Sequence, residues 1–133
     1  MIGVRLAIAE EGEAVKRLLE AAGYWWAKDC DWSDLRPFWL VAEKQGRIVG
    51  TLQTIYAQPV SRIEFLAVDP GLRKIDRAWV VKELCAQAWA GLKECRASYV
   101  AFMVNEAEAS WRGILERHGA FVIDSGPLMM LRC

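Results

Sequence analysis

The sequence predicts an α/β (α+β) protein with a mixed, mostly antiparallel sheet of about seven strands flanked by about four helices. Several short segments alternate apolar and polar residues as strands do, and longer segments repeat apolar residues with the period of a helix. Along the chain these segments follow the order strand, helix, short helix, three strands, helix, strand, helix, two strands. This order is typical of helices packed on one mixed sheet.

The first strand and helix precede a segment without a clear period. Residues 2–10 begin with the alternation of a strand, with Ile2, Val4 and Leu6 on one face, which predicts a strand there. Residues 10–24 place apolar side chains on one helical stripe, which predicts a helix that ends at Gly23. That stripe contains Val15, Leu18, Leu19 and Ala22. Residues 25–37 mix tryptophans with Asp and Ser and predict only a short helix or a loop.

Three strands are expected in the middle of the chain. Residues 38–44 and 47–56 flank the dipeptide Gln45-Gly46, which predicts a hairpin with a compact turn. Residues 60–68 form the third predicted strand, which ends at the "DPG" of residues 69–71.

The second half of the chain predicts two more helices and three more strands. Residues 77–93 form the longest predicted helix, with one broad apolar face made of Val80, Val81, Leu84, Cys85, Ala88 and Leu92. Residues 98–105 are almost continuously apolar, as in a strand buried on both faces. Residues 106–119 predict a weaker helix interrupted by Gly113, and residues 120–124 and 127–132 a closing hairpin.

The composition indicates one globular domain over residues 1–133, because 54% of the residues are hydrophobic and the length suffices for a buried core. The 17 basic and 17 acidic residues cancel, so no global field attracts nucleic acid or an anionic membrane. The four cysteines lack metal-site spacing, so no metal is expected. No signal peptide or membrane span is apparent, and a cytoplasmic protein is expected.

Three sequence landmarks resemble the GNAT superfamily, whose members transfer an acyl group from acyl-coenzyme A to an amine. They are "IEFLAVDP" with the following "RKIDRA", then "VNEAEAS", and finally "ILERHGAF". Their order and spacing cover essentially the whole chain. The resemblance implies a single GNAT-like domain, acetyl-CoA or another acyl-CoA as co-substrate, and an amine acceptor on a small molecule or a protein.

The family motif after "VDP" is Q/R-x-x-G-x-G/A at the start of the long helix, where backbone amides hold the coenzyme pyrophosphate. In register it covers Arg73, Lys74, Ile75, Asp76, Arg77 and Ala78. Arg73 and Ala78 fit the motif. Asp76 replaces the first glycine, and Arg77 replaces a usually aliphatic residue.

Asp76 leaves two interpretations open. As a preferred N-cap, Asp76 could cap the helix and occupy the amides that a pyrophosphate would need. Alternatively, the loop still binds coenzyme A, because the cations Arg73, Lys74 and Arg77 compensate for the carboxylate.

The resemblance implies further site residues on the neighbouring strands. Glu64 corresponds to a glutamate that takes the proton of the amine in many relatives, although it could equally point to solvent or pair with Arg62. Leu66, Ala67 and Val68 match the strand whose backbone bonds the pantetheine arm. Asn105 matches an Asn near the pantetheine, or caps the last helix.

The family's general acid is missing. Many relatives carry a tyrosine where this chain has Leu115, and leucine cannot donate a proton. His118, Tyr99 and Tyr56 are the other candidates for that role. General acid catalysis is worth about 10²–10⁴-fold, so its loss weakens catalysis without abolishing it.

Tryptophans gather where relatives form the wall of the acceptor site. Trp25, Trp26 and Trp32 could hold an apolar or flat amine by stacking or cation–π contact. The alternative is that these side chains, together with Trp39, fill the core or the seam of a homodimer.

Two functions therefore compete. The first is an N-acyltransferase in which Glu64 is the base. The second is a GNAT-like protein that has lost catalysis and serves in binding or structure, favoured by Asp76 and Leu115 together. The ending "LERHGAF" also resembles some small phage-encoded GNAT-like proteins. A regulator that only binds coenzyme A lies between the two.

Overall fold

The computed structural model describes residues 1–35, 38–102, 113 and 115–117. The chain divides into two compact units, Met1–Met103 and Val104–Cys133. In the second unit, residues 113 and 115–117 are helical, within the last helix that the sequence predicts. A single domain over residues 1–133 stays a prediction.

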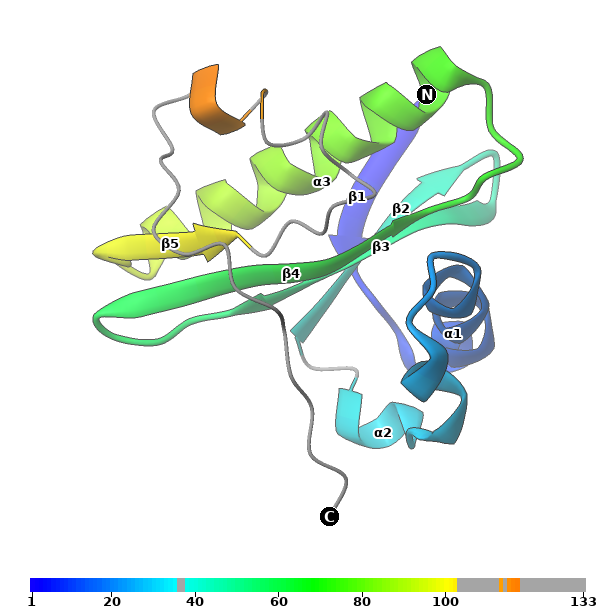
Figure 1. The fold of residues 1–133 in the computed structure, drawn as a ribbon, viewed down its shortest axis with the longest axis horizontal. Helices are drawn as coiled ribbons and strands as arrows, with labels where there is room; N and C mark the ends of the chain where they lie inside the picture. Colours follow the sequence, from blue (N-terminus) through cyan, green and yellow to red (C-terminus); the bar gives the residue numbers. More distant parts are fainter. Residues whose placement is uncertain (36–37, 103–112, 114, 118–133) are drawn as a thin grey trace. The chain divides into compact units, whose positions relative to one another are not determined.

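The first unit contains a five-stranded sheet whose strands follow one another in chain order (Figure 1). The strands are β1 Ile2–Leu6, β2 Trp39–Lys44, β3 Arg47–Ile55, β4 Val60–Val68 and β5 Tyr99–Phe102. The first four pair antiparallel, whereas β4 and β5 pair in parallel. A parallel pair requires a crossover, which the long helix between β4 and β5 supplies. The predicted mixed, mostly antiparallel sheet is confirmed for these strands.

Helices pack on both faces of this sheet (Figure 1). The α-helices are α1 Gly12–Ala21, α2 Trp32–Leu35 and α3 Lys74–Glu94, and the short 3₁₀ helices are η1 Ala9–Glu11 and η2 Trp25–Asp29. Helix α3 packs against β1 to β4, and α1 packs against β3 and β4. Gly23, with a φ of 95°, follows α1 as predicted.

The face under α3 is a close-packed aliphatic core. Val80, Leu84, Ala88 and Leu92 of α3 are buried there, as the sequence predicts. Burying a Val or Leu side chain contributes about 1.5–3 kcal/mol, so this face supplies much of the stability. Gly50 of β3 lets the helix approach, because a Cβ at Gly50 would clash with Val80 and lie 3.1 Å from Leu84.

The predicted hairpin between β2 and β3 is confirmed. Gln45 and Gly46 form its turn with φ values of 52° and 76°. Two residues with positive φ match the right-handed twist of the flanking strands. The hairpin end therefore has a fixed shape, with Lys44 and Arg47 paired across it.

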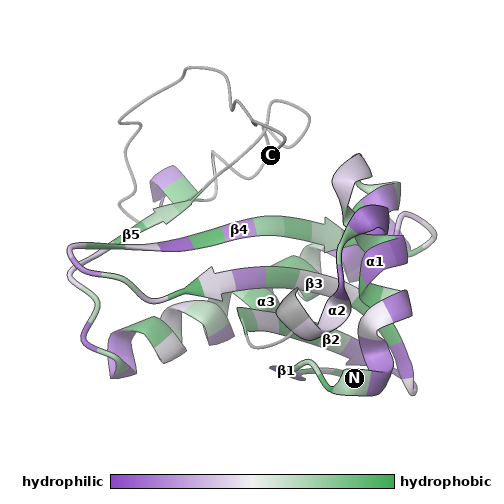
Figure 2. Cartoon of the chain, turned by 90° about the horizontal axis from the view of Figure 1, so that it is seen from below, coloured by the Kyte–Doolittle hydropathy of each residue, from purple (hydrophilic) through white to green (hydrophobic). Residues whose placement is uncertain are grey.

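Strand β4 contains a bulge that the alternation does not predict. Thr51 pairs with Ala67 and Gln53 with Glu64, so two residues of β4 lie opposite one residue of β3. The extra residue is Phe65, which has a φ of 57°. In Figure 2, purple and green alternate in the first half of β4, whereas the second half is green. The bulge lies where the alternating part of β4 gives way to the apolar part, and bulges of this kind bend a strand.

The described residues contain fewer elements than predicted, with five strands and three α-helices instead of about seven and about four. The closing hairpin at 120–132 lies outside the described residues, and the last helix is described at 113 and 115–117 only. Residues 25–35, which lack a sustained apolar period, form only η2 and the short α2.

The start of the long helix was predicted three residues too late. Helix α3 begins at Lys74, not at residue 77. No glycine or proline lies between Arg73 and Ala78 to delay helical geometry, so the helix begins soon after the turn at residues 69–71.

Candidate active site

The start of α3, here residues 69–78, is shaped by a turn around Asp69. The Gly71 amide donates to Asp69 Oδ1 at 2.8 Å, and the Leu72 amide donates to the Asp69 carbonyl at 3.2 Å. Arg73 then takes the N-cap position with extended backbone and no side-chain cap bond. The turn thus delivers the chain into the helix without a capping side chain.

The first amides of α3 are available to an anion. The first hydrogen bond of the helix runs from the Arg77 amide to the Arg73 carbonyl at 2.9 Å. The amides of Lys74, Ile75 and Asp76 precede it, and no acceptor for them occurs in the described part of the chain. The positive end of the helix dipole adds to their attraction for negative charge.

Asp76 lies in the first turn of α3 and binds cations instead of amides. Its Oδ2 accepts from Arg73 Nε at 2.9 Å and lies 3.2 Å from Lys44 Nζ, and its Oδ1 accepts from an Arg73 NH2 group at 3.4 Å. These bonds, first of all the one from Arg73, hold the pKa of the Asp76 carboxyl below its ordinary value. The interpretation that the Asp76 side chain caps the helix is therefore wrong, because this side chain accepts no hydrogen bond from a backbone amide of α3.

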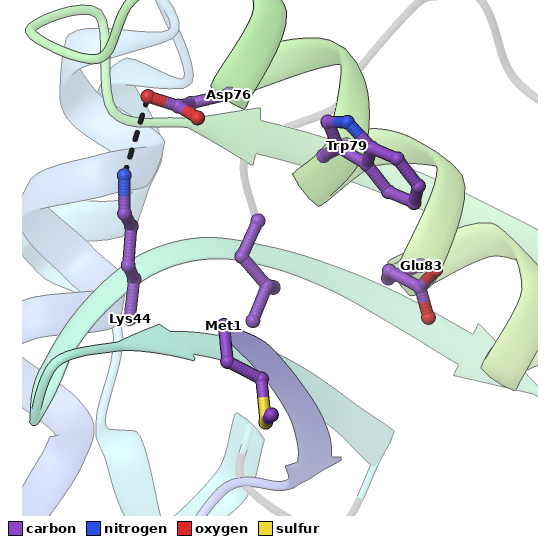
Figure 3. A pocket seen from close by; sticks show the side chains of 6 residues that line it. Met1, Lys44, Asp76, Trp79 and Glu83 are labelled. Carbon is purple, nitrogen blue, oxygen red and sulfur yellow. Dashed lines mark ion pairs between the residues drawn. The ribbon is translucent and has the colours of Figure 1, made fainter.

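The β2–β3 hairpin supports the α3 start with two ion pairs. Arg47 binds Asp69 at 2.8 Å, and Lys44 binds Asp76 at 3.2 Å. Figure 3 shows Asp76 extending from α3 toward Lys44, at a cavity of about 430 Å³. The cavity is lined by Met1, Ile2, Lys44, Asp76, Trp79 and Glu83. The carboxylate is thus held on the β1–β2 side of the helix.

The second half of β4 leads directly into this turn. Leu66, Ala67 and Val68 are its last residues. The described pairing of β4 with β5 covers Val60 to Ile63, before the bulge. In the described residues, the β5-side edge of Leu66 to Val68 therefore has no strand partner.

Glu64 is buried on the face of the sheet that packs against α1. It pairs across the strands with Gln53, which pairs in turn with Trp39 of the α1-side core. Glu64 is 6% exposed, and its Oε1 lies 4.0 Å from a guanidinium nitrogen of Arg62. The alternative that Glu64 points to solvent is therefore wrong. The alternative that Glu64 pairs with Arg62 finds only this long contact.

An aromatic cluster surrounds the bulge beside Glu64. Phe65 stacks on Trp39 with ring centroids 6.2 Å apart and meets Trp26 and Tyr24 edge-on at 4.9 and 5.4 Å. Such ring pairs contribute about 0.5–1.5 kcal/mol each beyond burial. Trp39 is fully buried, and its Nε1 donor has no partner among the described residues. The cluster holds the left-handed conformation of Phe65.

The predicted substrate tryptophans lie in three different environments. Trp26 packs in the cluster on Phe65, and Trp25 is 61% exposed. Trp32 donates from Nε1 to the Ile8 carbonyl at 3.3 Å and packs against Gly12, where a Cβ would lie 2.5 Å from its ring. Trp26 and Trp32 thus make packing contacts, as the core-filling alternative states, and Trp25 is accessible.

The remaining candidate residues are either exposed or belong to the second unit. Tyr99 and Tyr56 are 67% and 47% exposed. Asn105 and His118 lie outside the described residues, and Leu115 belongs to the second unit. Cys85 of α3 is mostly buried, and burial raises the pKa of its thiol to about 12, so this cysteine belongs to the packing of the helix.

In residues 1–35, 38–102, 113 and 115–117, no group of three His, Cys, Asp or Glu side chains is arranged to hold a metal ion. None of the helices in this part of the chain is long and apolar enough to cross a membrane.

No protein-family model matches the sequence, and no curated protein matches it either. Solved structures do match over nearly the whole chain. An aminoglycoside N-acetyltransferase, AAC(6')-Iy in complex with CoA, superposes with a TM-score of 0.76 at 15% identity, covering 100% of this chain and 96% of that one. The chain has the GNAT fold.

Two other structures extend this result. A ribosomal-protein-alanine N-acetyltransferase from Brucella melitensis biovar Abortus 2308 matches with a TM-score of 0.75 at 14% identity, covering 98% of this chain and 99% of that one. A transcriptional regulator from Bacillus halodurans C-125 matches with a TM-score of 0.76 at 16% identity, covering 98% and 100%. Identities this low establish the GNAT fold and not its activity.

Two residues of this GNAT-fold site were missed from the sequence. Lys44 binds Asp76 from β2, and Gln53 lies between Trp39 and Glu64. Neither belongs to a motif, and both contacts depend on which strands become neighbours. The only sequence signal for Lys44 was the predicted hairpin, which places this residue at the end of a strand. Gln53 had no such signal.

Proposed function

We propose that the chain is an N-acyltransferase that moves an acetyl or other acyl group from acyl-CoA to the amine of a small molecule or protein. The observation that carries this proposal is the position of Asp76, which binds Lys44 and Arg73 and leaves the first amides of α3 to an anion. The GNAT fold and the CoA in the aminoglycoside N-acetyltransferase structure support it.

The proposed coenzyme site combines two parts of the chain. The amides of Lys74 to Asp76 bind the pyrophosphate, assisted by the exposed cations Arg73, Lys74 and Arg77. The backbone of Leu66 to Val68 bonds the pantetheine arm. Asn105 is a further proposed contact. The coenzyme supplies the acyl thioester that the amine attacks.

The proposed base is Glu64. Its buried carboxylate lies on the α1 face, beside the aromatic residues proposed to line the acceptor site. Glu64 takes a proton from the acceptor ammonium, so that the neutral amine can attack. The chain positions the amine, and Trp25 and Trp26 contact its apolar part, with Trp32 supporting them.

A calorimetric titration with acetyl-CoA tests the proposal. We expect the native protein to bind with micromolar affinity, and Asp76→Gly to bind at least as tightly, because the variant removes a negative charge near the phosphates. If the native protein and Asp76→Gly both show no binding at about 1 mM ligand, the proposal is wrong.

A catalytically inactive GNAT-like binding protein is the second candidate. Arg73, a cation expected to serve the phosphate, is already bonded to Asp76, and Leu115 stands at the position of the usual acid. This candidate predicts acetyl-CoA binding, or none, without acyl transfer. A panel of primary amines with a thiol-release assay separates it from the enzyme.

A further inference from the structure

Asp76 is shared between an exposed cation and a more buried one. The Arg73 side chain is 78% exposed, whereas those of Lys44 and Asp76 are 26% and 15% exposed. Arg73 belongs to the α3 start itself, while Lys44 is fixed at the end of β2 by its pairing with Ile2 and Arg47. The ion pair with Lys44 is thus the better anchored and the less screened of the two.

This arrangement creates a competition for Arg73. A phosphate at the amides of α3 would attract Arg73, which at present binds Asp76 through two nitrogens. Arg73 can leave the carboxylate at low cost only if another cation continues to neutralise it, because an uncompensated carboxylate would repel the phosphate. Lys44 is the cation that meets this requirement.

We infer that Lys44 is a positioning residue for anion binding. It holds Asp76 on the β1–β2 side of α3 and frees Arg73 for the ligand phosphate. The inference deepens the proposed function and rests on it. Lys44 acts through Asp76, and its ammonium need not contact the coenzyme.

The test is a cycle of four proteins, titrated with coenzyme A at low salt: native, Lys44→Met, Asp76→Asn and the double variant. We expect Lys44→Met alone to weaken binding about three- to tenfold, as loss of a partly buried ion pair does. In the Asp76→Asn background the same change should alter the affinity by less than about twofold, because no carboxylate remains to be neutralised.

Three controls separate positioning from folding. Lys44→Arg should retain the native affinity within about twofold, since the charge is kept. Arg5→Met removes a cation that pairs with Glu11 and Glu43 and with no residue of the α3 start, and it should leave the affinity unchanged. NMR titration should show the pKa of Asp76 rising toward its ordinary value in Lys44→Met, because Lys44 is one cause of its lowering.

The outcomes are distinct. If Lys44→Met weakens binding equally in the native and the Asp76→Asn backgrounds, Lys44 attracts the phosphate directly. If Lys44→Met binds coenzyme A with the native affinity, Lys44 has no part in binding. Either result overturns the inference and leaves the proposed function standing. Binding by Asp76→Asn without binding by the native protein overturns it as well. If none of the four proteins binds coenzyme A, the proposed function is wrong and the inference with it.

Discussion

The two faces of the sheet differ in the chemistry that they bury. The face under α3 is aliphatic, and Val80 and Leu84 pack so closely that β3 needs a glycine opposite them. The face under α1 carries aromatic rings and three buried polar side chains, Thr51, Gln53 and Glu64. One sheet thus separates the face that stabilises the fold from the face where the proposed chemistry takes place.

The largest expected effect is on the α1 face. Glu64→Gln should lower turnover about 10²–10⁴-fold, because the amide cannot accept the proton of the ammonium. Thermal unfolding should change little, since the side chain keeps its shape. Glu43→Gln, in the more exposed part of β2, is the matched control and should keep native turnover. Equal turnover of both variants would contradict the role of Glu64.

A substitution on the α3 face should lower the free energy of unfolding and not the turnover. Leu84→Ala removes a fully buried side chain and should lower the free energy of unfolding by about 2–5 kcal/mol. Urea denaturation measures this loss, and Gln87→Ala on the exposed side of α3 should change it little. If Leu84→Ala lowers turnover as strongly as Glu64→Gln in protein that is still folded, the separation of the two faces is wrong.

A smaller effect is expected from one added methyl group. Gly50→Ala should cost about 1–3 kcal/mol, because the new Cβ meets Val80 and Leu84 and forces them to move. Gly3→Ala on β1 is the matched control, since a Cβ there meets nothing within 4 Å. Equal denaturation midpoints for the two variants would show that the α3 face is less tightly packed than described.

The smallest expected effect is a loss of stability at acidic pH through Glu11. Two hydrogen bonds from Arg5, at 2.8 and 2.7 Å, hold the pKa of Glu11 below its ordinary value. The unfolded chain therefore binds the proton more readily, and the stabilisation is present above the ordinary carboxyl pKa and lost as the pH falls through the lowered one. This loss should be at most about 1 kcal/mol.

Denaturation midpoints between about pH 6 and about pH 3 measure the effect of Glu11. The slope against pH should be shallower in Glu11→Gln, which has no proton to gain. A slope identical to that of the native protein would show that the Arg5 contact does not stabilise the fold.

Much of the first unit follows from local patterns. The alternation in residues 38–44, 47–56 and 60–68 predicted strands that the structure confirms, and Gln45-Gly46 predicted the turn. In the segment predicted at residues 2–10, only residues 2–6 form a strand. The apolar face of α3 was also correct. These features depend on neighbours in sequence, where side-chain period and turn chemistry act directly.

The missed features depend on contacts between distant segments. The bulge at Phe65 does not interrupt the apolar run of β4, so no pattern marks it. The role of Asp76 was ambiguous because its partner Lys44 comes from another strand. The tryptophans of residues 25–32 could not be sorted, because their exposure is set by α1 and β4 and not by their own segment.

The φ of 57° at Phe65 links the aromatic cluster to the proposed base. A left-handed backbone costs a residue with a Cβ about 1–2 kcal/mol, and the ring contacts with Trp39, Trp26 and Tyr24 offset that cost. An acceptor that displaced Trp26 would withdraw part of this support, and β4 would tend to relax toward extended geometry. The neighbouring Glu64 would then turn with its backbone. If the proposed function holds, recognition at the aromatic cluster and the orientation of Glu64 would be coupled through the φ of Phe65.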